Sequence, residues 1–139
     1  MPGMDATSGL ADLRRAEALA PKLLYAVDAR LAPSSPVTDI AQLTSLTAAA
    51  VAAGHGHVLD SSHVIFPNGA ITLVLILAES HLSIHTWPEE NLIAIDLFSC
   101  GAIDGEAVIS GLTSSLALEA VSVRRLSRGP RPEGHRQSG

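Results

Sequence analysis

The sequence predicts an α/β protein of the α+β type: a two-layer sandwich in which two helices cover one face of a mostly antiparallel sheet. Two β-branched-rich runs, 57–66 and 70–79, are separated by a turn-forming Pro-Asn-Gly triplet, as in a β-hairpin. Residues 91–99 alternate along a wholly aliphatic face, as in a strand. Two further segments carry apolar residues at three- and four-residue spacing, which is typical of amphipathic helices.

Strands are expected before, between and after the helices. The first covers 22–30 and stops at a turn that contains Pro33 and Pro36. The hairpin and the strand over 91–99 follow, and a last strand covers 119–126. One helix comes after the first strand and another after the strand over 91–99, which favours helices layered on one face of the sheet.

Both predicted helices have recognisable end signals. The first covers 40–53, with Thr38 or Asp39 as its N-cap and Gly54 at its C-terminal cap position. The second begins near Asp104 and continues along a similar apolar stripe.

Length and composition bound the domain organisation and the partners. At 139 residues we expect a single domain over 22–128, a flexible N-terminal arm over 1–21 and a disordered tail over 129–139. A formal net charge of -5 offers no basic field, so nucleic acid is not expected as a partner. The longest apolar stretch, 70–78, is far shorter than the roughly 20 residues of a membrane-spanning helix. The first residues carry no secretory signal, and we expect a cytoplasmic protein.

Chemically versatile residues gather between Glu79 and Gly101. This stretch holds the only tryptophan, the only cysteine and two of the six histidines of the chain. It begins where an aliphatic run ends and is broken by a proline, so its polar side chains are expected to line a strand end or a loop beside the sheet. These side chains are Ser80, His81, Ser83 and His85.

Composition and spacing alone leave several interpretations open. A metal site would draw on five histidines, which are His55, His57, His63, His81 and His85. No CxxC or HExxH spacing accompanies them. Cys100 and His85 could form the thiol pair of a hydrolase, although a GxSxG elbow is absent. The histidines could also be hydrogen-bonded core residues of a small, non-catalytic oligomeric protein.

The stretch ESHLSIHTWPE, followed by AIDLFSCG, resembles the signature of the bacterial S-adenosylmethionine decarboxylase proenzymes, a pyruvoyl-dependent, self-cleaving family. The likeness keeps the family's spacing between a self-cleavage serine, a processing histidine and a catalytic cysteine. These three residues fall on Ser80, His85 and Cys100. A weaker likeness extends over 22–128.

The resemblance implies that the chain generates its own cofactor, a covalent pyruvoyl group derived from Ser80. The Ser80 hydroxyl would attack the Glu79 carbonyl, and β-elimination from the resulting ester would give chains 1–79 and 80–139. The remaining dehydroalanine would hydrolyse to the pyruvoyl group. His85, expected on the same side of an extended segment, would carry protons in these steps.

The implied reaction converts S-adenosyl-L-methionine to decarboxylated S-adenosylmethionine and CO2 for polyamine and spermidine biosynthesis. The substrate would form a Schiff base with the pyruvoyl ketone, and the Cys100 thiol would return a proton to Cα. The family's second processing hydroxyl falls on Thr72, its adenine-stacking aromatic on Phe66 and its ribose-binding acid on Glu89. The resemblance implies no metal. It also implies a four-layer homodimer of cleaved chain pairs, formed by packing two sheets together.

One motif of the family is missing. A Gly-Arg-His before the first strand helps to close the family's nucleoside pocket, whereas residues 20–22 here are Ala-Pro-Lys. Relatives with the same self-cleaving core act on L-ornithine or L-arginine, and Asp28 or Glu89 could pair with such a basic side chain. A second alternative is an unprocessed partner subunit that keeps the fold only as an interaction surface. The joint presence of the serine, histidine and cysteine argues against that alternative.

Overall fold

The structure is a computed structural model that describes residues 9, 11–12 and 20–130. Its elements follow the chain in the order β1 (Lys22–Leu31), α2 (Ile40–Ala53), β2 (Val58–Ile65), β3 (Ile71–Leu77), β4 (Ser80–Trp87), the 3-10 helix η1 (Pro88–Glu90), β5 (Leu92–Cys100), α3 (Gly105–Ser115) and β6 (Leu118–Arg128). The arm expected over 1–21 and the tail expected over 129–139 lie almost entirely outside the described residues. In the part of the chain that is described, no helix is long and apolar enough to cross a membrane.

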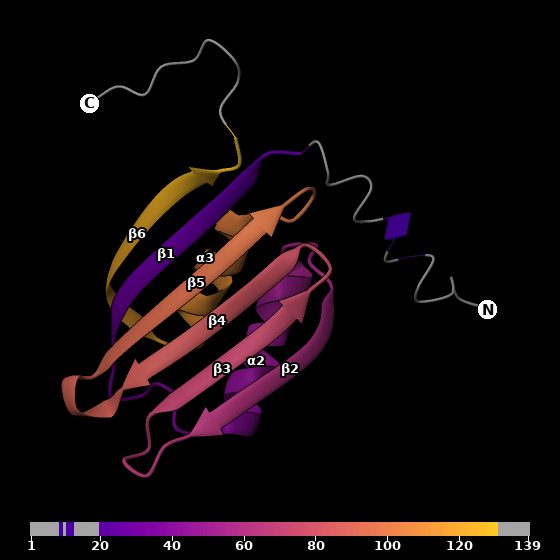
Figure 1. Cartoon of the computed structure of the whole chain (residues 1–139). Coiled ribbons are helices and arrows are strands. Elements are labelled where there is room, and N and C mark those ends of the chain that lie inside the picture. The colour runs from indigo at the N-terminus through magenta and orange to yellow at the C-terminus, as the bar shows by residue number, and fades with distance from the viewer. Residues whose placement is uncertain (1–8, 10, 13–19, 131–139) are drawn as a thin grey trace.

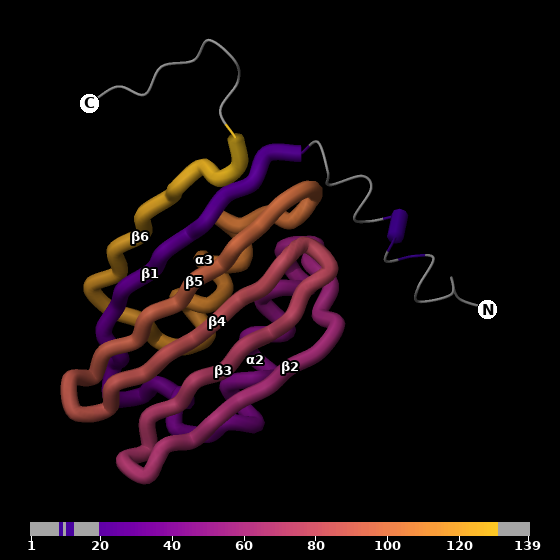
Figure 2. The backbone as a smooth tube through the Cα atoms, in the orientation of Figure 1, coloured from indigo at the N-terminus to yellow at the C-terminus, as the bar shows by residue number. Residues whose placement is uncertain are grey.

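Six strands within residues 20–130 form one sheet, in the order β2-β3-β4-β5-β1-β6. Every neighbouring pair is antiparallel. Figure 2 shows β1 and β6, which are far apart in the sequence, running side by side. Both helices lie behind the sheet in Figure 1, on one of its two faces. The predicted two-layer α+β architecture is therefore confirmed.

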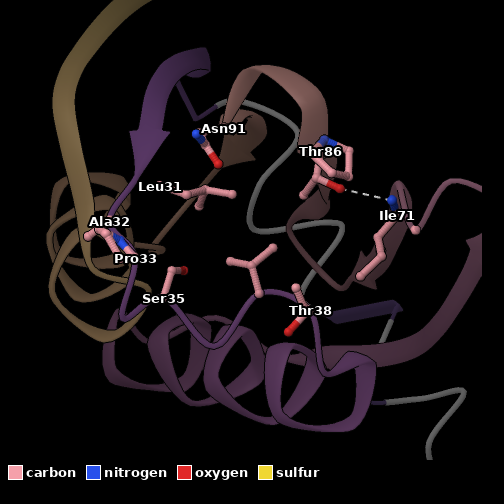
Figure 3. A pocket seen from close by; sticks show the side chains of 11 residues that line it. Leu31, Ala32, Pro33, Ser35, Thr38, Ile71, Thr86 and Asn91 are labelled. Carbon is pink, nitrogen blue, oxygen red and sulfur yellow. Dashed lines mark hydrogen bonds between the residues drawn. The ribbon is translucent and has the colours of Figure 1, made fainter.

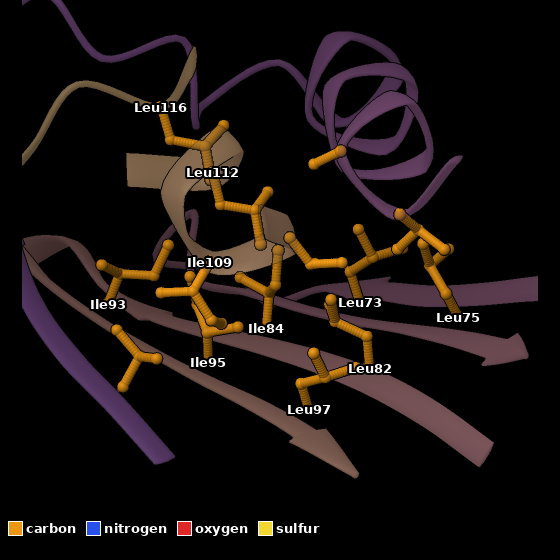
Figure 4. Close-up of a cluster of buried hydrophobic side chains, with 14 of the residues drawn as sticks. Leu73, Leu75, Leu82, Ile84, Ile93, Ile95, Leu97, Ile109, Leu112 and Leu116 are labelled. Atoms are coloured by element: carbon orange, nitrogen blue, oxygen red, sulfur yellow. The ribbon is translucent and has the colours of Figure 1, made fainter. Parts of the chain in front are cut away.

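The core lies between the sheet and the two helices. Side chains alternate along a strand, so every second residue of the central strands points toward the helices. The buried residues of β3, β4 and β5 on this side include Leu73, Leu75, Leu82, Ile84, Ile93, Ile95 and Leu97. Figure 4 shows them on the side of the sheet that carries the two helices, where Leu112 of α3 and Leu116 at its C-cap are also fully buried. Burial of each such side chain contributes about 1.5–3 kcal/mol to folding.

The helix ends match the expected caps. The Asp39 side chain accepts a hydrogen bond from the Gln42 backbone N–H at 3.1 Å, which makes Asp39 the N-cap of α2. The Asp104 side chain accepts from the Ala107 N–H at 3.1 Å in the same way at the start of α3. Gly54 follows the last turn of α2, as predicted. These N-caps fix where both helices begin.

The expectation that Ser80, His81, Ser83 and His85 lie at a strand end or in a loop is wrong for most of this segment. Residues 80–87 form β4, which pairs with β3 on one side and with β5 on the other. Leu82 and Ile84 provide the apolar alternate positions of a central strand, and both are fully buried. The polar residues between them point to the opposite side of the sheet, which we call the open face: the face away from α2 and α3. Only Ser80 lies at a strand end.

Candidate active site

The Glu79–Ser80 peptide bond lies at a turn between two central strands. β3 ends at Leu77, Ala78 and Glu79 form the turn, and β4 begins at Ser80. The φ angle of Ser80 is +142°, in a region that side-chain-bearing residues rarely adopt. Such a backbone costs of the order of 1–3 kcal/mol and persists only where its surroundings impose it. The peptide expected to cleave is therefore one of the strained points of the chain.

The side chain of Glu79 is buried, with 2% of its surface exposed. Its Oε1 accepts a hydrogen bond from the backbone N–H of His57 at 2.9 Å. Its Oε2 lies 2.6 Å from Nδ1 of the same histidine. His57 thus satisfies both oxygens of a carboxylate that would be costly to bury without partners.

Cys100 contacts the backbone carbonyl group of Glu79. The Cys100 thiol, at the end of β5, is buried and donates a hydrogen bond from Sγ to the Glu79 carbonyl oxygen at 3.1 Å. This oxygen becomes negatively charged when a nucleophile attacks the carbonyl carbon, and a positioned donor stabilises that charge. The structure therefore brings together Glu79, Ser80 and Cys100, three of the expected site residues.

Thr72 and His85 form a second group on the open face. They are direct partners across β3 and β4, and Thr72 Oγ1 lies 3.2 Å from His85 Nδ1. The Trp87 ring lies 6.3 Å from the His85 ring. The contact pairs the expected processing histidine with the expected processing hydroxyl.

His85 does not lie beside Ser80 within one chain. The two residues are five positions apart along β4, which corresponds to about 16 Å of extended strand. The alternation of a strand also directs residues five positions apart to opposite faces. The expectation that His85 shares a side with Ser80 is therefore not met, because the segment is a regular strand after its first residue.

Phe66 and Glu89 lie at the Thr72 end of the sheet. The Phe66 side chain, just after β2, is 46% exposed. Asn68 Nδ2, in the β2–β3 turn, donates to Glu89 Oε1 at 2.8 Å and ties this turn to η1. A hydrogen bond with its own backbone N–H, together with the Asn68 contact, lowers the pKa of Glu89 below its ordinary value. Glu89 is thus a fixed, ionised and accessible carboxylate.

Comparison with known proteins identifies the family. The family described as S-adenosylmethionine decarboxylase matches residues 24–129, most of the chain. The chain belongs to the S-adenosylmethionine decarboxylase family.

Named decarboxylase proenzymes of two bacteria share 36% and 42% of the matched residues with this chain. An S-adenosylmethionine decarboxylase proenzyme of Symbiobacterium thermophilum is 36% identical over 104 residues, which covers 74% of this chain and 79% of that protein. The proenzyme 2 of Bacillus anthracis is 42% identical over 74 residues, or 52% of this chain. That match spans 60% of the length of the Bacillus protein.

A solved structure shares the fold. The crystal structure of the adenosylmethionine decarboxylase from Aquifex aeolicus VF5 aligns with a TM-score of 0.68 and 25% sequence identity. The alignment covers 85% of this chain and 98% of that one. The sheet with two helices on one face is therefore the architecture of a decarboxylase of this family.

The histidines considered as metal ligands do not converge. His57 contacts Glu79, His85 contacts Thr72, and the His81 ring stacks on Phe98 with the ring centres 6.0 Å apart. In the described residues, no group of three or more His, Cys, Asp or Glu side chains is placed to hold a metal ion. Cys100 and His85 are likewise separated, so they do not form the thiol pair of a hydrolase within one chain.

Asp28, considered as a partner for a basic substrate, already has a cationic neighbour. Its Oδ2 accepts a hydrogen bond from Arg124 Nη2 at 3.4 Å, across β1 and β6. This contact makes Asp28 less available to an ornithine or arginine side chain. Glu89 keeps its accessible carboxylate.

A cavity lies at the end of the sheet remote from Ser80 (Figure 3). It has a volume of about 180 Å³, and none of its lining residues is charged. Thr86, on one wall, accepts a hydrogen bond from the Ile71 backbone N–H at 2.8 Å. The cavity offers no titratable group for acid–base chemistry and is separate from the strained peptide.

His57 is the residue whose place in the site was not foreseen from the sequence. It was considered only as a metal ligand, because no motif links it to the acid that precedes Ser80. The available signal was the acid itself: a glutamate at the end of an aliphatic strand requires a polar partner if it is buried. The strand pairing that supplies this partner follows from the β2–β3 register.

Proposed function

We propose that this chain is a self-processing, pyruvoyl-dependent decarboxylase of S-adenosyl-L-methionine that acts in polyamine and spermidine biosynthesis. The observation that carries the proposal is the geometry of the Glu79–Ser80 bond, with Cys100 Sγ 3.1 Å from its carbonyl oxygen and Ser80 at a φ of +142°. A strained peptide with a donor on its carbonyl is well suited to attack by the adjoining hydroxyl. The likeness to named decarboxylase proenzymes supports the same activity.

Processing begins with an acyl shift. The Ser80 Oγ forms a bond to the Glu79 carbonyl carbon, the carbon–nitrogen bond breaks, and the hydroxyl proton ends on the Ser80 nitrogen. Cys100 stabilises the negative charge that develops on the Glu79 oxygen. Loss of the Ser80 Cα proton then expels Glu79 as a free carboxylate and leaves dehydroalanine. Water replaces the nitrogen, which departs as ammonia, and residue 80 becomes a pyruvoyl group.

The pyruvoyl group would form at residue 80. This position fits the group, because the buried Cys100 thiol lies beside it, against the carbonyl oxygen of the preceding residue. Once formed, the group supplies a sink for the electrons released with CO2. Cys100 is the proton source for the substrate Cα, since a thiol with an ordinary pKa of about 8.5 is mostly protonated at neutral pH. Phe66 and Glu89 would hold the adenine and the ribose of the substrate.

We place the complete site between two copies of the chain, in a four-layer homodimer. Ser80 and Cys100 lie about 16 Å along β4 from Thr72 and His85, so one chain alone does not assemble the processing residues. Two open faces packed in opposite directions would bring His85 of the partner subunit toward Ser80. Several large apolar side chains on the open face favour such packing, namely Val64, Ile76, Trp87 and Leu126.

Mixed dimers test the shared site. A Ser80→Ala chain and a His85→Ala chain should each remain uncleaved when made separately. When the two are made together, the His85→Ala chain should cleave, because the Ser80→Ala chain supplies the missing histidine. Absence of cleavage in mixed dimers, or a monomer in light scattering, contradicts the shared site.

Release of CO2 identifies the substrate. Purified protein is incubated with carboxyl-labelled S-adenosyl-L-methionine, L-ornithine and L-arginine in parallel. The proposal expects release from S-adenosyl-L-methionine. Release from a basic amino acid alone would mean that the self-cleaving core has been kept with a different substrate pocket, which the Ala-Pro-Lys at 20–22 makes the second candidate. No release from an uncleaved chain would favour a non-catalytic partner subunit.

We propose a cytoplasmic location, where polyamine precursors are made.

A further inference from the structure

We propose that His57 is a positioning residue for self-cleavage, which it promotes by holding the Glu79 carboxylate. The inference rests on the proposed function, because it concerns cleavage of the Glu79–Ser80 bond. His57 lies directly before the edge strand β2, whereas Glu79 lies in the turn before β4. Nothing in the chemistry of the cleavage itself requires His57 to exchange a proton.

Three hydrogen bonds join His57 to this turn. Its backbone N–H donates to Glu79 Oε1 at 2.9 Å, and its Nδ1 lies 2.6 Å from Glu79 Oε2. Its carbonyl oxygen accepts from the Ala78 N–H at 2.9 Å. The ring contact donates a hydrogen bond when Nδ1 carries the proton. The two residues that precede Ser80 are therefore both attached to the same histidine.

Glu79 is held from two directions. His57 fixes its side chain, with only 2% of the residue exposed, and Cys100 fixes its carbonyl oxygen. With both groups fixed, the plane of the Glu79–Ser80 peptide has little freedom to rotate, and Ser80 remains at its positive φ. This is the arrangement from which the Ser80 hydroxyl must reach the carbonyl carbon.

Loss of the His57 ring would remove the partner of Glu79 Oε2 and leave only the backbone N–H of residue 57 on Oε1. A buried carboxylate that loses a partner is costly, so the side chain would turn toward solvent and draw the Glu79 backbone with it. The carbonyl oxygen would then leave the Cys100 thiol. Displacement of reacting atoms by about 1 Å is enough to slow a reaction by up to about 100-fold.

The test follows cleavage of newly synthesised full-length chain by intact mass over time. His57→Ala should cleave at least about tenfold more slowly than wild type. His57→Gln, which keeps one side-chain donor, should recover part of the rate. The matched control is His63→Ala, because His63 is an exposed histidine of the adjoining strand β2 and should leave the rate unchanged. Cleavage of His57→Ala at the wild-type rate overturns the proposal.

Hydroxylamine separates positioning from other defects. It cleaves esters, so it accelerates chain breakage only in a variant that completes the acyl shift. If His57 positions the carbonyl for attack, hydroxylamine does not raise the slow cleavage rate of His57→Ala, because the acyl shift itself is slow. Recovery of cleavage by hydroxylamine would show that the ester forms normally, and the proposal would be wrong.

Two further measurements exclude a folding defect and a failure of the proposed function. His57→Ala in the Ser80→Ala background should melt cooperatively, and a loss of cooperative melting assigns the slow cleavage to unfolding and overturns the positioning role. The Glu79→Ala and His57→Ala changes combined should be no slower than the slower single variant, since the ring contact that His57→Ala removes is already absent in Glu79→Ala. A wild-type chain that never cleaves contradicts the proposed function itself, independently of His57.

Discussion

Removing the hydrogen bond from Cys100 to the Glu79 carbonyl should slow self-cleavage. The bond is 3.1 Å long, and the thiol is buried. A hydrogen bond between neutral groups contributes about 1 kcal/mol, and one to a charged group about 1.5–3 kcal/mol. The bond therefore gains about 0.5–2 kcal/mol as charge develops on the oxygen, which corresponds to a rate factor of about 2 to 30.

The assay compares cleavage of three full-length variants by intact mass. Cys100→Ala should cleave about 2 to 30 times more slowly than wild type. Cys100→Ser keeps a donor of similar size and should still cleave, but it should lose most decarboxylation because a hydroxyl is a much weaker acid than a thiol. Ser99→Ala is the matched control, since Ser99 is the buried neighbour on β5 and bonds to the Leu23 carbonyl instead.

Two outcomes would refute this account of Cys100. Cleavage of Cys100→Ala at the wild-type rate would show that the thiol does not stabilise the charge on the Glu79 oxygen. Full decarboxylation by Cys100→Ser would remove the thiol as the proton donor to the substrate. Slow cleavage of Ser99→Ala would instead assign the effect to packing at the end of β5.

The remaining predictions concern the core, a surface ion pair and the substrate pocket. Leu82→Ala, in the uncleaved Ser80→Ala background, should lower the free energy of unfolding by about 2–5 kcal/mol in chemical denaturation, because Leu82 is fully buried; a loss below about 1 kcal/mol would contradict its place in the core. The hydrogen bond from Arg125 lowers the pKa of Glu106, so this exposed pair should add a small stability at neutral pH that is lost as pH falls through the lowered pKa. Glu106→Gln should remove that part of the pH dependence of the melting temperature. An unchanged profile would show that the Glu106–Arg125 pair does not contribute to stability. Phe66→Ala should raise KM for S-adenosyl-L-methionine while cleavage proceeds normally; an unchanged KM would remove Phe66 from the adenine site.

Most of the fold could be predicted because its signals are local. The helix over 40–53 has a clear period and both caps, and the turn at 67–69 fixes the hairpin. β4 was missed because His81, Ser83 and His85 occupy the alternate positions that face the open side of the sheet. Their polarity concealed the apolar alternation of Leu82 and Ile84, which defines the strand.

The composition of the site was predictable, but its arrangement was not. Motif spacing placed Ser80, His85 and Cys100 in one stretch, and the structure brings Cys100 to the carbonyl that precedes Ser80. Spacing along a sequence does not state the direction of side chains, so the distance between Ser80 and His85 required the strand geometry. The contact between His57 and Glu79 depends on long-range strand pairing that no local pattern encodes.

The mass of freshly purified wild-type protein under denaturing conditions tests the central claim most directly. Self-cleavage predicts two chains, 1–79 and 80–139, and a mass for the second that corresponds to a pyruvoyl group in place of Ser80. The Ser80→Ala variant should give one intact chain of 139 residues under the same conditions. A single intact chain from folded wild-type protein would contradict the claim that this chain makes its own cofactor.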